Sequence, residues 1–343
     1  MLCFMTEPLE PWQRSWTTPR RGVAIIAAFA LVAIGTSPAG PAARKRTPPP
    51  RSHLVPLTRV PGTAAAVPPA EVTVAAAGDL ACRPGQAPTP IECRQQEVSD
   101  LVLADRNVTK VLLLGDLQYE NGELDGFRQS YEASYGRFKD RSVPAPGNHE
   151  YNTPGATGYY AFFGAAAHPE TNGYYSLDLS PSWHLVVLNS NCGFVACDAA
   201  SEQVRWLRAD LARSTKPCTI AIWHHPRFTS AQRGGNLSTA PFFDALYAAG
   251  ADLVVSGHEH QYERFDPQRP DETPDPTRGI REFVVGTGGR SVYPFATPRP
   301  NSVQRAIGFG YLRLDLRAGS YGWTFVGEPS TTPFTDTGTG VCH

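Results

Sequence analysis

Side chains that can bind metal ions recur in five short blocks along this chain. They are Gly78-Asp79, Gly115-Asp116-Leu117-Gln118-Tyr119, Gly147-Asn148-His149-Glu150, His224-His225-Pro226 and Gly257-His258-Glu259-His260. Hard oxygen donors mixed with imidazoles, and without cysteine, suit a pair of ions such as Fe, Zn or Mn rather than a thiolate zinc site. Two adjacent metals that share a carboxylate are a device for in-line attack on phosphorus. The pattern therefore indicates a dinuclear phosphoesterase.

The oxygen donors differ in what they indicate alone and together. A single aspartate after a strand, such as Asp79, is more often a helix cap or turn former. Asp116 repeats the pattern, and two carboxylates close in space repel each other unless cations lie between them. Asp116, in a central block, is the natural bridge. Tyr119 is expected as a ligand only of a strongly acidic ion such as Fe(III), and Asn148 would leave the second metal more electrophilic.

The histidines supply the other donors. Alternate residues of an extended segment point to opposite sides, so His258 and His260 can straddle two metals. His224 and His225 are adjacent, so one of them is expected to be a ligand, and His149 is placed to face substrate. Three acidic residues either orient ligands or are solvated, and the sequence leaves that choice open: Glu150, Glu259 and Asp252.

The predicted elements place the blocks at strand ends. Apolar runs at 71–77, 108–114, 218–223 and 253–256 are expected strands, and a block follows each. Residues 142–145 lead into the loop that holds Asn148. Further strands are expected at 174–179, 184–189, 280–285, 311–316 and 321–326, and helices at 96–105, 127–138, 200–213 and 241–249. Open α/β structures place active sites just beyond the carboxyl ends of strands.

The N-terminal region is expected to direct export. The apolar run 22–36 follows Arg20-Arg21, and it is shorter than the about 20 residues of a spanning helix. We predict a signal peptide or anchor at 1–43, a Pro/Ala-rich linker at 44–70 and a catalytic domain at 71–343. The paired arginines suggest the twin-arginine route to an extracytoplasmic location. The alternative is an uncleaved membrane anchor at 22–36 with the catalytic domain outside.

The cysteines favour the same location. The chain has 7 cysteines, of which Cys3 lies in the leader, and an even number remains for disulfides in an exported protein. Proximity along the chain suggests Cys82–Cys93 and Cys192–Cys197, which leaves Cys218–Cys342 to tie the C-terminal tail to the core. Free thiols in a cytosolic enzyme are the alternative.

The net charge of −1, with 18% charged residues, gives no general attraction to nucleic acid or anionic lipid. No basic stripe or stacking motif suggests a nucleic-acid interface. The expected partner is a small-molecule phosphoester, and the sequence leaves the oligomeric state open.

The five blocks resemble the motifs of the purple acid phosphatase branch of the calcineurin-like metallophosphoesterases. That branch has, in order, Asp-x-Gly, Gly-Asp-x-x-Tyr, Gly-Asn-His-Glu/Asp, Val-x-x-His and Gly-His-x-His. The resemblance covers roughly residues 72–290, and the order of five motifs is highly specific. The segment 257–264, GHEHQYER, is especially close to the family's form.

The resemblance implies a fold, a metal pair and an activity. The family fold is an α/β sandwich of two mixed β-sheets packed face to face and flanked by helices. One metal, Fe(III), would be held by Asp79, Tyr119 and His260, with Asp116 bridging. The other, a divalent Zn, Fe or Mn, would be held by the remaining ligands: Asn148, His224 and His258. The implied enzyme is an acid phosphatase-like metallophosphoesterase.

Three departures from the family pattern matter, of which one, Ala221 in place of the usual valine before His224, is conservative. Ala81 stands where glycine is usual, and the site lacks the Asp-x-His form of other branches, which favours Tyr119 as the replacement ligand. The segment 227–235 lacks the histidine that plant enzymes place there as a candidate general acid. The predictions for acid and substrate contacts are therefore His149 as the acid, with His225 or Arg227 as contacts.

These residues predict hydrolysis of phosphate monoesters by a metal-activated hydroxide, with Asp116 and His149 as the catalytic residues. The nearest alternative keeps the site and changes the substrate, giving a phosphodiesterase or nucleotide-cleaving enzyme. A further alternative is a secreted binding module with a decayed site, against which the intact blocks argue.

Overall fold

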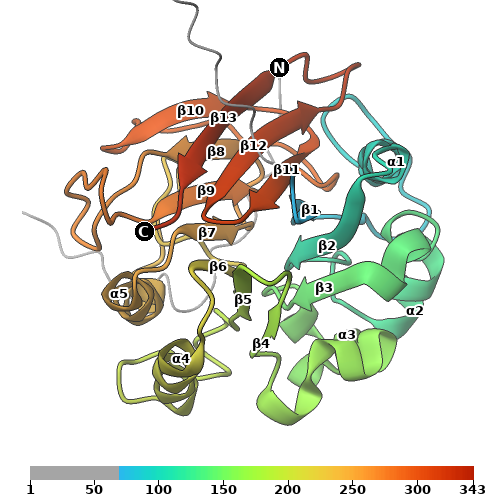
Figure 1. The fold of residues 1–343 in the computed structure, drawn as a ribbon. Coiled ribbons are helices and arrows are strands. Elements are labelled where there is room, and N and C mark those ends of the chain that lie inside the picture. Colours follow the sequence, from blue (N-terminus) through green and yellow to red (C-terminus); the bar gives the residue numbers. More distant parts are fainter. Residues whose placement is uncertain (1–68) are drawn as a thin grey trace, which may run out of the picture. The chain divides into compact units, whose positions relative to one another are not determined.

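The computed structural model describes residues 69–343, which form two β-sheets with helices on their outer faces (Figure 1). The first sheet has the order β13-β12-β11-β1-β2-β3. Its strands are β1 (Val72–Ala77), β2 (Val108–Leu114), β3 (Ser142–Ala145), β11 (Gly310–Arg317), β12 (Ser320–Gly327) and β13 (Thr335–Val341). The strands β1, β2 and β3 are parallel, whereas β11 to β13 pair antiparallel, so the sheet is mixed.

The second sheet has the order β10-β8-β9-β7-β6-β5-β4. Its strands are β4 (Tyr175–Asp178), β5 (Trp183–Val187), β6 (Cys218–Trp223), β7 (Leu253–Ser256), β8 (Tyr262–Phe265), β9 (Arg281–Val285) and β10 (Ser302–Ala306). The central strands β5, β6, β7 and β9 are parallel, and the outer strands are antiparallel. Two mixed sheets flanked by helices are the fold class that the family resemblance implied.

The main core lies between the two sheets, because alternate residues of a strand point to opposite faces. In β1, Val74 and Ala76 belong to this inner core, while Ala75 and Ala77 pack on the outer side. The helices cover the outer faces: α1 to α3 lie beside β1–β3, and α4 and α5 lie beside β5–β7 (Figure 1). Both faces of the central strands are therefore buried.

The α-helices are α1 (Gln95–Ala104), α2 (Leu124–Gly126), α3 (Thr157–Phe163), α4 (Glu202–Arg213) and α5 (Ala240–Ala249). Short 3-10 turns lie at Glu150–Asn152, Pro154–Ala156, Gly164–Ala167, Pro169–Thr171 and Leu237–Thr239. The sequence did not predict α3, β8, β10 or β13. The predicted strand 184–189 begins one residue earlier and ends at Val187.

The single helix predicted at 127–138 is wrong. The segment continues from α2 as a π-helical turn, Phe127–Tyr131, and then a 3-10 segment, Tyr135–Arg141. Ser134, at the junction, leaves helical geometry, and its hydroxyl donates to the carbonyl of Tyr131. Serine competes with a helix by such local bonds, and the packing of the buried aromatic rings takes precedence over regular spacing.

The three disulfides have the predicted pairing. Cys82–Cys93 and Cys192–Cys197 close short loops, and Cys218–Cys342 links β6 to the C-terminal tail. The predicted leader at 1–43 and the linker up to residue 68 lie outside the described residues. None of the helices within residues 69–343 is long and apolar enough to cross a membrane.

Candidate metal centre

The blocks meet because parallel strands of both sheets end at the same edge of the sandwich. Asp79 follows β1, Asp116 follows β2, His224 follows β6 and His258 follows β7. The loops approach one another so closely that glycine is needed. A Cβ on Gly147 would lie 2.1 Å from Asp116 Oδ1, closer than atoms can approach.

One set of donor atoms gathers around the Tyr119 phenol. Its oxygen lies 2.9 Å from Asp79 Oδ1 and 3.1 Å from His260 Nε2. His260 Nε2 is in turn 3.1 Å from Asp79 Oδ1. Tyr119 also lies 3.1 Å from Asp116 Oδ2. The donors predicted for Fe(III) are thus brought together.

A second set gathers around His224. Its Nε2 lies 3.1 Å from Asn148 Oδ1 and 3.2 Å from His258 Nδ1. The same Nε2 lies 3.1 Å from Asp116 Oδ2. A single carboxylate oxygen of Asp116 therefore belongs to both sets, which is the position of a bridging ligand.

The spacing of these donors fits metal coordination. Two ligands bound at about 2.1 Å to one ion, at right angles to each other, lie about 3.0 Å apart. Within the two sets the donor atoms lie 2.9 to 3.2 Å from their neighbours. Carboxylate, phenol, amide and imidazole are also the donor types that suit Fe, Zn or Mn. The residues therefore fit two cations.

The second oxygen of each carboxylate is fixed by a backbone N–H. The amide of His258 donates to Asp79 Oδ2 at 2.7 Å, and the amide of His149 donates to Asp116 Oδ1 at 2.8 Å. Asp79, Asp116 and His258 have φ of 60°, 50° and 70°, a conformation that costs free energy for residues other than glycine. Such strain is typical of functional sites.

The imidazoles are oriented in the same manner. His224 Nδ1 pairs with the carbonyl of Leu114 at 2.8 Å, and His260 Nδ1 pairs with Ser291 Oγ at 2.8 Å. Partners of this kind fix the ring so that the other nitrogen faces the metal. The sequence did not indicate Ser291, because it belongs to no metal-binding pattern.

The extended conformation predicted for His258 to His260 is wrong, although the two rings do reach opposite donor sets. Residues 257–261 form a turn, in which the amide of Glu259 donates to the carbonyl of Gly257 at 2.9 Å. The left-handed backbone at His258 produces the divergence of the rings that alternation along a strand was expected to produce.

The central carboxylate is held in its charged form. Burial opposes the charge of Asp116, but His224, His149 and His258 outweigh burial and hold the pKa of that carboxyl well below its usual range. Burial also opposes the charge of His224, yet Asp116 raises the pKa of its imidazole to about 9. Asp116 is therefore anionic at any physiological pH and available to cations.

The tyrosine is held in its neutral form. Burial, and then the carboxylates of Asp116 and Asp79, raise the pKa of the Tyr119 phenol well above its usual range. A phenol in this setting ionises only when a cation of high charge binds its oxygen, as metal ions invert the local pKa pattern. This is the chemical condition that Fe(III) meets.

Two of the three acidic neighbours lie at the centre. Glu150 accepts hydrogen bonds from the amides of Asp116, Leu117 and Gly147 at 2.7 to 2.9 Å, so it fixes the backbone of two blocks. Burial and the charge of Asp116 raise the pKa of Glu150 to about 7. Burial also raises the pKa of Glu259 to about 8.

The third acidic residue, Asp252, is buried away from the centre, so it neither orients a ligand nor is solvated, the two roles that the sequence left open. Asp252 precedes β7 and lies at the opposite end of that strand from His258. Its carboxylate accepts from the amides of Thr219 and His343 at 2.8 and 3.0 Å. Asp252 therefore fixes the C-terminal tail beside the Cys218–Cys342 disulfide.

His149 lies beside the carboxylate of Asp116, which both donor sets share. Its ring contacts the Tyr119 ring, with centroids 4.2 Å apart, and its Nε2 is 3.8 Å from Asp116 Oδ2. Its Nδ1 lies 2.7 Å from the carbonyl of Glu120, which can only accept a hydrogen bond. The proton on Nδ1 is thereby fixed, and Nε2 is the nitrogen that faces the centre.

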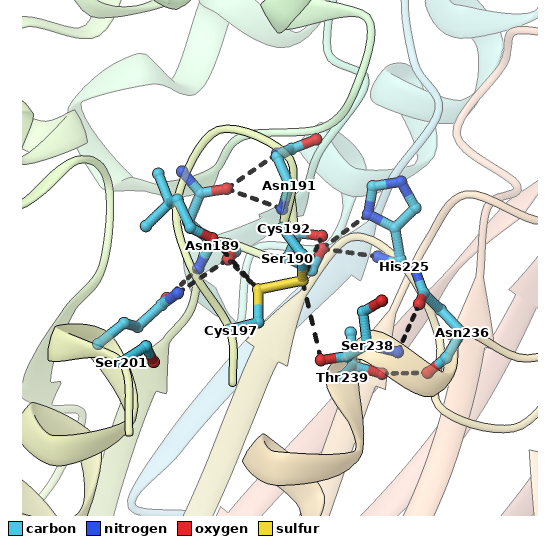
Figure 2. Close-up of a disulfide and its surroundings, with 12 residues drawn as sticks. Asn189, Ser190, Asn191, Cys192, Cys197, Ser201, His225, Asn236, Ser238 and Thr239 are labelled. Carbon is cyan, nitrogen blue, oxygen red and sulfur yellow. Dashed lines mark hydrogen bonds between the residues drawn. A yellow bond between two sulfur atoms is a disulfide. The ribbon is translucent and has the colours of Figure 1, made fainter. Parts of the chain in front are cut away.

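His225 lies beside the second donor set, and its ring centroid is 4.5 Å from that of His258. Ser190 holds it in place: the hydroxyl accepts from the His225 amide and pairs with Nδ1, both at 2.9 Å. Figure 2 shows these bonds next to the Cys192–Cys197 disulfide. Burial, and then the charge of His224, lower the pKa of His225 to about 3, so its ring is neutral.

Arg227 does not join this group, so the predicted substrate contact lies elsewhere. Its amide donates to Glu282, its guanidinium donates to the carbonyl of Pro270, and its Cζ lies 4.3 Å from the Phe228 ring. The buried carboxylate of Glu282 and the aromatic ring attract the arginine away from the metal ligands.

Comparisons with known proteins establish the family and the fold of the chain. The model of the calcineurin-like phosphoesterase family matches residues 72–262, more than half of the chain, so the chain belongs to that family. It is 34% identical over 158 residues to purple acid phosphatase 22 of Arabidopsis thaliana, and this alignment covers 43% of this chain and 35% of the relative. It is 29% identical over 216 residues to human acid phosphatase type 7, which covers 52% of this chain and 48% of the relative. The chain thus spans about a third to a half of these relatives.

The fold has a counterpart among solved structures. The purple acid phosphatase PPD1 from yellow lupin seeds superposes with a TM-score of 0.60 and 19% identity, over 78% of this chain and 53% of that chain. At this identity the likeness concerns the fold: two mixed sheets with flanking helices. The purple acid phosphatases are thus relatives of this chain in sequence and in architecture.

Proposed function

We propose that this protein is a dinuclear metallophosphoesterase that hydrolyses phosphate monoesters. The observation that carries the proposal is Asp116 Oδ2, which lies 3.1 Å from the Tyr119 oxygen in one donor set and 3.1 Å from His224 Nε2 in the other. Packing alone does not require a buried carboxylate oxygen between two sets of metal-type donors, because simpler side chains would fill the same space. Binding of two metal ions does require it. The small-molecule phosphoester is the expected partner.

The proposed metals are Fe(III) in the set with Tyr119 and a divalent Zn, Fe or Mn in the set with Asn148. A bound pair of this kind supplies a water of lowered pKa as nucleophile and stabilises charge on phosphoryl oxygens. Asp79, Tyr119 and His260 would hold the first ion, and the amide oxygen of Asn148 would leave the second more electrophilic.

The protein's own contribution is to deliver a proton and to position the ester. His149 Nε2 is the group that faces the centre, with the opposite nitrogen fixed by the Glu120 carbonyl. In its protonated form it donates to the oxygen of the departing alcohol. His225 is neutral and is held by Ser190. It would form a hydrogen bond to the ester on the side of the second donor set.

We also propose that the catalytic domain acts outside the cytoplasm, by export of the chain through its N-terminal segment. Three disulfides support this, because disulfides persist in oxidising compartments. Whether the segment is removed or anchors the chain is decided by N-terminal sequencing of the exported protein.

The test is metal analysis and visible spectroscopy of the purified protein beside its Asp116→Asn variant. We expect two metals per chain including iron, a visible absorption band from the Tyr119 phenolate, and turnover of p-nitrophenyl phosphate. The variant should lose metals and turnover together. Unchanged turnover by Asp116→Asn, or a wild-type protein that takes up no metal on reconstitution, would end the proposal.

The diesterase alternative uses the same donors, so the metal analysis does not separate it from the monoesterase. The same preparation assayed on bis-p-nitrophenyl phosphate decides between them. A kcat/KM higher for the diester than for the monoester would transfer the assignment to the diesterase.

A further inference from the structure

The loop that follows His225 carries an arginine to the metal centre. Residues 230–235 are fixed against 293–296: Ala231 forms an isolated β-bridge with Phe295, and the amide of Ala296 donates to the carbonyl of Ser230 at 2.8 Å. The first loop follows β6 and His224, and the second follows β9. In the second loop, Tyr293 contacts His260. Arg233 follows Ala231 by two residues in the first of these loops and is exposed.

Arg233 is placed by a stack of three groups. Its guanidinium carbon lies 5.3 Å from the centroid of the Tyr293 ring, within the range of a cation–π contact. The Tyr293 ring stacks on the ring of His260, with centroids 4.2 Å apart and an interplanar angle of 13°. The amide of Tyr293 also donates to the carbonyl of His260 at 3.2 Å. One aromatic ring therefore separates the guanidinium from a predicted metal ligand.

The positive charge of Arg233 lies at the mouth of the site. Its side chain is exposed to solvent, while the Tyr293 ring on which it lies stacks on the ring of His260.

The other arginine close to the donors is differently placed. Arg290 lies with its guanidinium carbon 5.0 Å from the centroid of the Tyr119 ring, but its side chain is 11% exposed and bonds to Glu120 at 2.9 Å. Arg227 is directed to Pro270. Among the described arginines, Arg233 combines an aromatic stack onto His260 with access from solvent.

We propose that Arg233, oriented by Tyr293, binds the non-bridging oxygens of the reacting phosphoryl group and so selects dianionic monoesters over monoanionic diesters. A guanidinium matches two phosphoryl oxygens with parallel hydrogen bonds. Its attraction is stronger for a dianion, and a diester has replaced one of those oxygens by an ester group. This inference rests on the proposed phosphoesterase function and deepens it, naming the residue that sets the substrate class.

The experiment compares Arg233→Ala, Arg233→Lys and a matched control. The control is Arg278→Ala, because Arg278 is also exposed and stacked on a tyrosine, with its guanidinium carbon 5.7 Å from the centroid of the Tyr247 ring, away from the metal ligands. Each metal-loaded protein is assayed on p-nitrophenyl phosphate and on bis-p-nitrophenyl phosphate. The dissociation constant of inorganic phosphate is measured by calorimetry, which is independent of turnover.

We expect Arg233→Ala to lose about 10- to 100-fold in kcat/KM on the monoester and to bind phosphate about tenfold more weakly. On the diester it should lose less than about threefold. Lysine should restore part of the loss, because it keeps the charge and lacks the planar fork. Arg278→Ala should match the wild type on every measurement.

Three results would overturn the inference while leaving the phosphoesterase in place. They are an unchanged phosphate dissociation constant in Arg233→Ala, equal losses on the two esters, and loss of bound metal, which would mean that Arg233 supports the metal ligands and not the substrate. Failure of the proposed function looks different, because the wild-type protein would then neither turn over the monoester nor bind phosphate.

Discussion

The three disulfides should contribute very unequally to stability, in an order set by the loops they close. Cys218 and Cys342 are 124 positions apart, Cys82 and Cys93 are 11 apart, and Cys192–Cys197 closes a loop of 5. The chain-entropy relation gives about 5 kcal/mol for the longest loop, about 3 kcal/mol for the middle one and about 2 kcal/mol for the shortest. Replacing each pair by alanines should reduce the free energy of unfolding in that order.

The assay is guanidinium chloride unfolding of the three double-alanine variants without reductant, followed by tryptophan fluorescence. The slope against denaturant should rise when a cross-link is removed, because the unfolded chain expands, so free energies rather than midpoints are compared. Equal losses for the three pairs, or a larger loss for Cys192–Cys197 than for Cys218–Cys342, would refute the reasoning from loop length.

Activity should follow a different order. The Cys192–Cys197 disulfide lies next to Ser190, which holds His225 by two contacts of 2.9 Å (Figure 2). Its removal should therefore lower kcat/KM several-fold at a temperature where the protein is fully folded. The Cys218–Cys342 disulfide lies at the opposite end of β6 from His224, so its removal should leave kcat/KM unchanged under the same conditions.

Three more predictions concern single side chains. Tyr119→Phe should keep the fold and lose the visible band, because no phenolate remains, and a spectrum of the iron-loaded variant checks this; a retained band would mean another chromophore. His149→Ala should lose about 100-fold or more in kcat on alkyl phosphates and much less on p-nitrophenyl phosphate, whose leaving group needs no proton; equal losses would exclude His149 as the acid. Burial lowers the pKa of His184, but hydrogen bonds to Asp210 at 2.8 Å and Asp178 at 3.0 Å outweigh it and raise the pKa above its usual value. This contribution to stability is complete below the unfolded pKa of about 6.5 and is lost as pH rises through the higher folded pKa. The free energy of unfolding of the wild type, measured with urea, should therefore exceed that of His184→Gln by a margin that is about 1 kcal/mol larger at acidic than at alkaline pH. A difference between the two proteins that does not change with pH would contradict this prediction.

The sequence was sufficient for features that depend on local pattern and chain order. Apolar runs mark β2, β6 and β7, whose predicted bounds agree with the structure. The polar residues after β1 and β2 had to meet once those strands were parallel and adjacent, and so had those after β6 and β7, because the carboxyl ends of adjacent parallel strands share an edge. Proximity along the chain also sufficed for two disulfides, and the third followed by elimination.

Features that depend on long-range packing could not be predicted in the same way. The segment 127–138 has helical spacing, but its buried aromatic rings and Ser134 divide it into two irregular turns. The left-handed backbone of His258 is stabilised by the hydrogen bond that its amide donates to the carboxylate of Asp79, a residue 179 positions away. Local propensity contains no information on a partner so distant.

The sequence by itself therefore determined which side chains could bind metals and which strands position them, because both depend only on the types of the residues and their order along the chain. Only the tertiary structure decided which charged neighbours reach the centre. Asp252 and Arg227 are close to metal ligands in sequence and lie elsewhere, whereas Ser291 and Arg233 belong to no motif, yet Ser291 contacts His260 and Arg233 lies on the Tyr293 ring beside it. The physical reason is that a side chain goes where its charge and hydrogen bonds are best paired, and those partners come from remote parts of the chain.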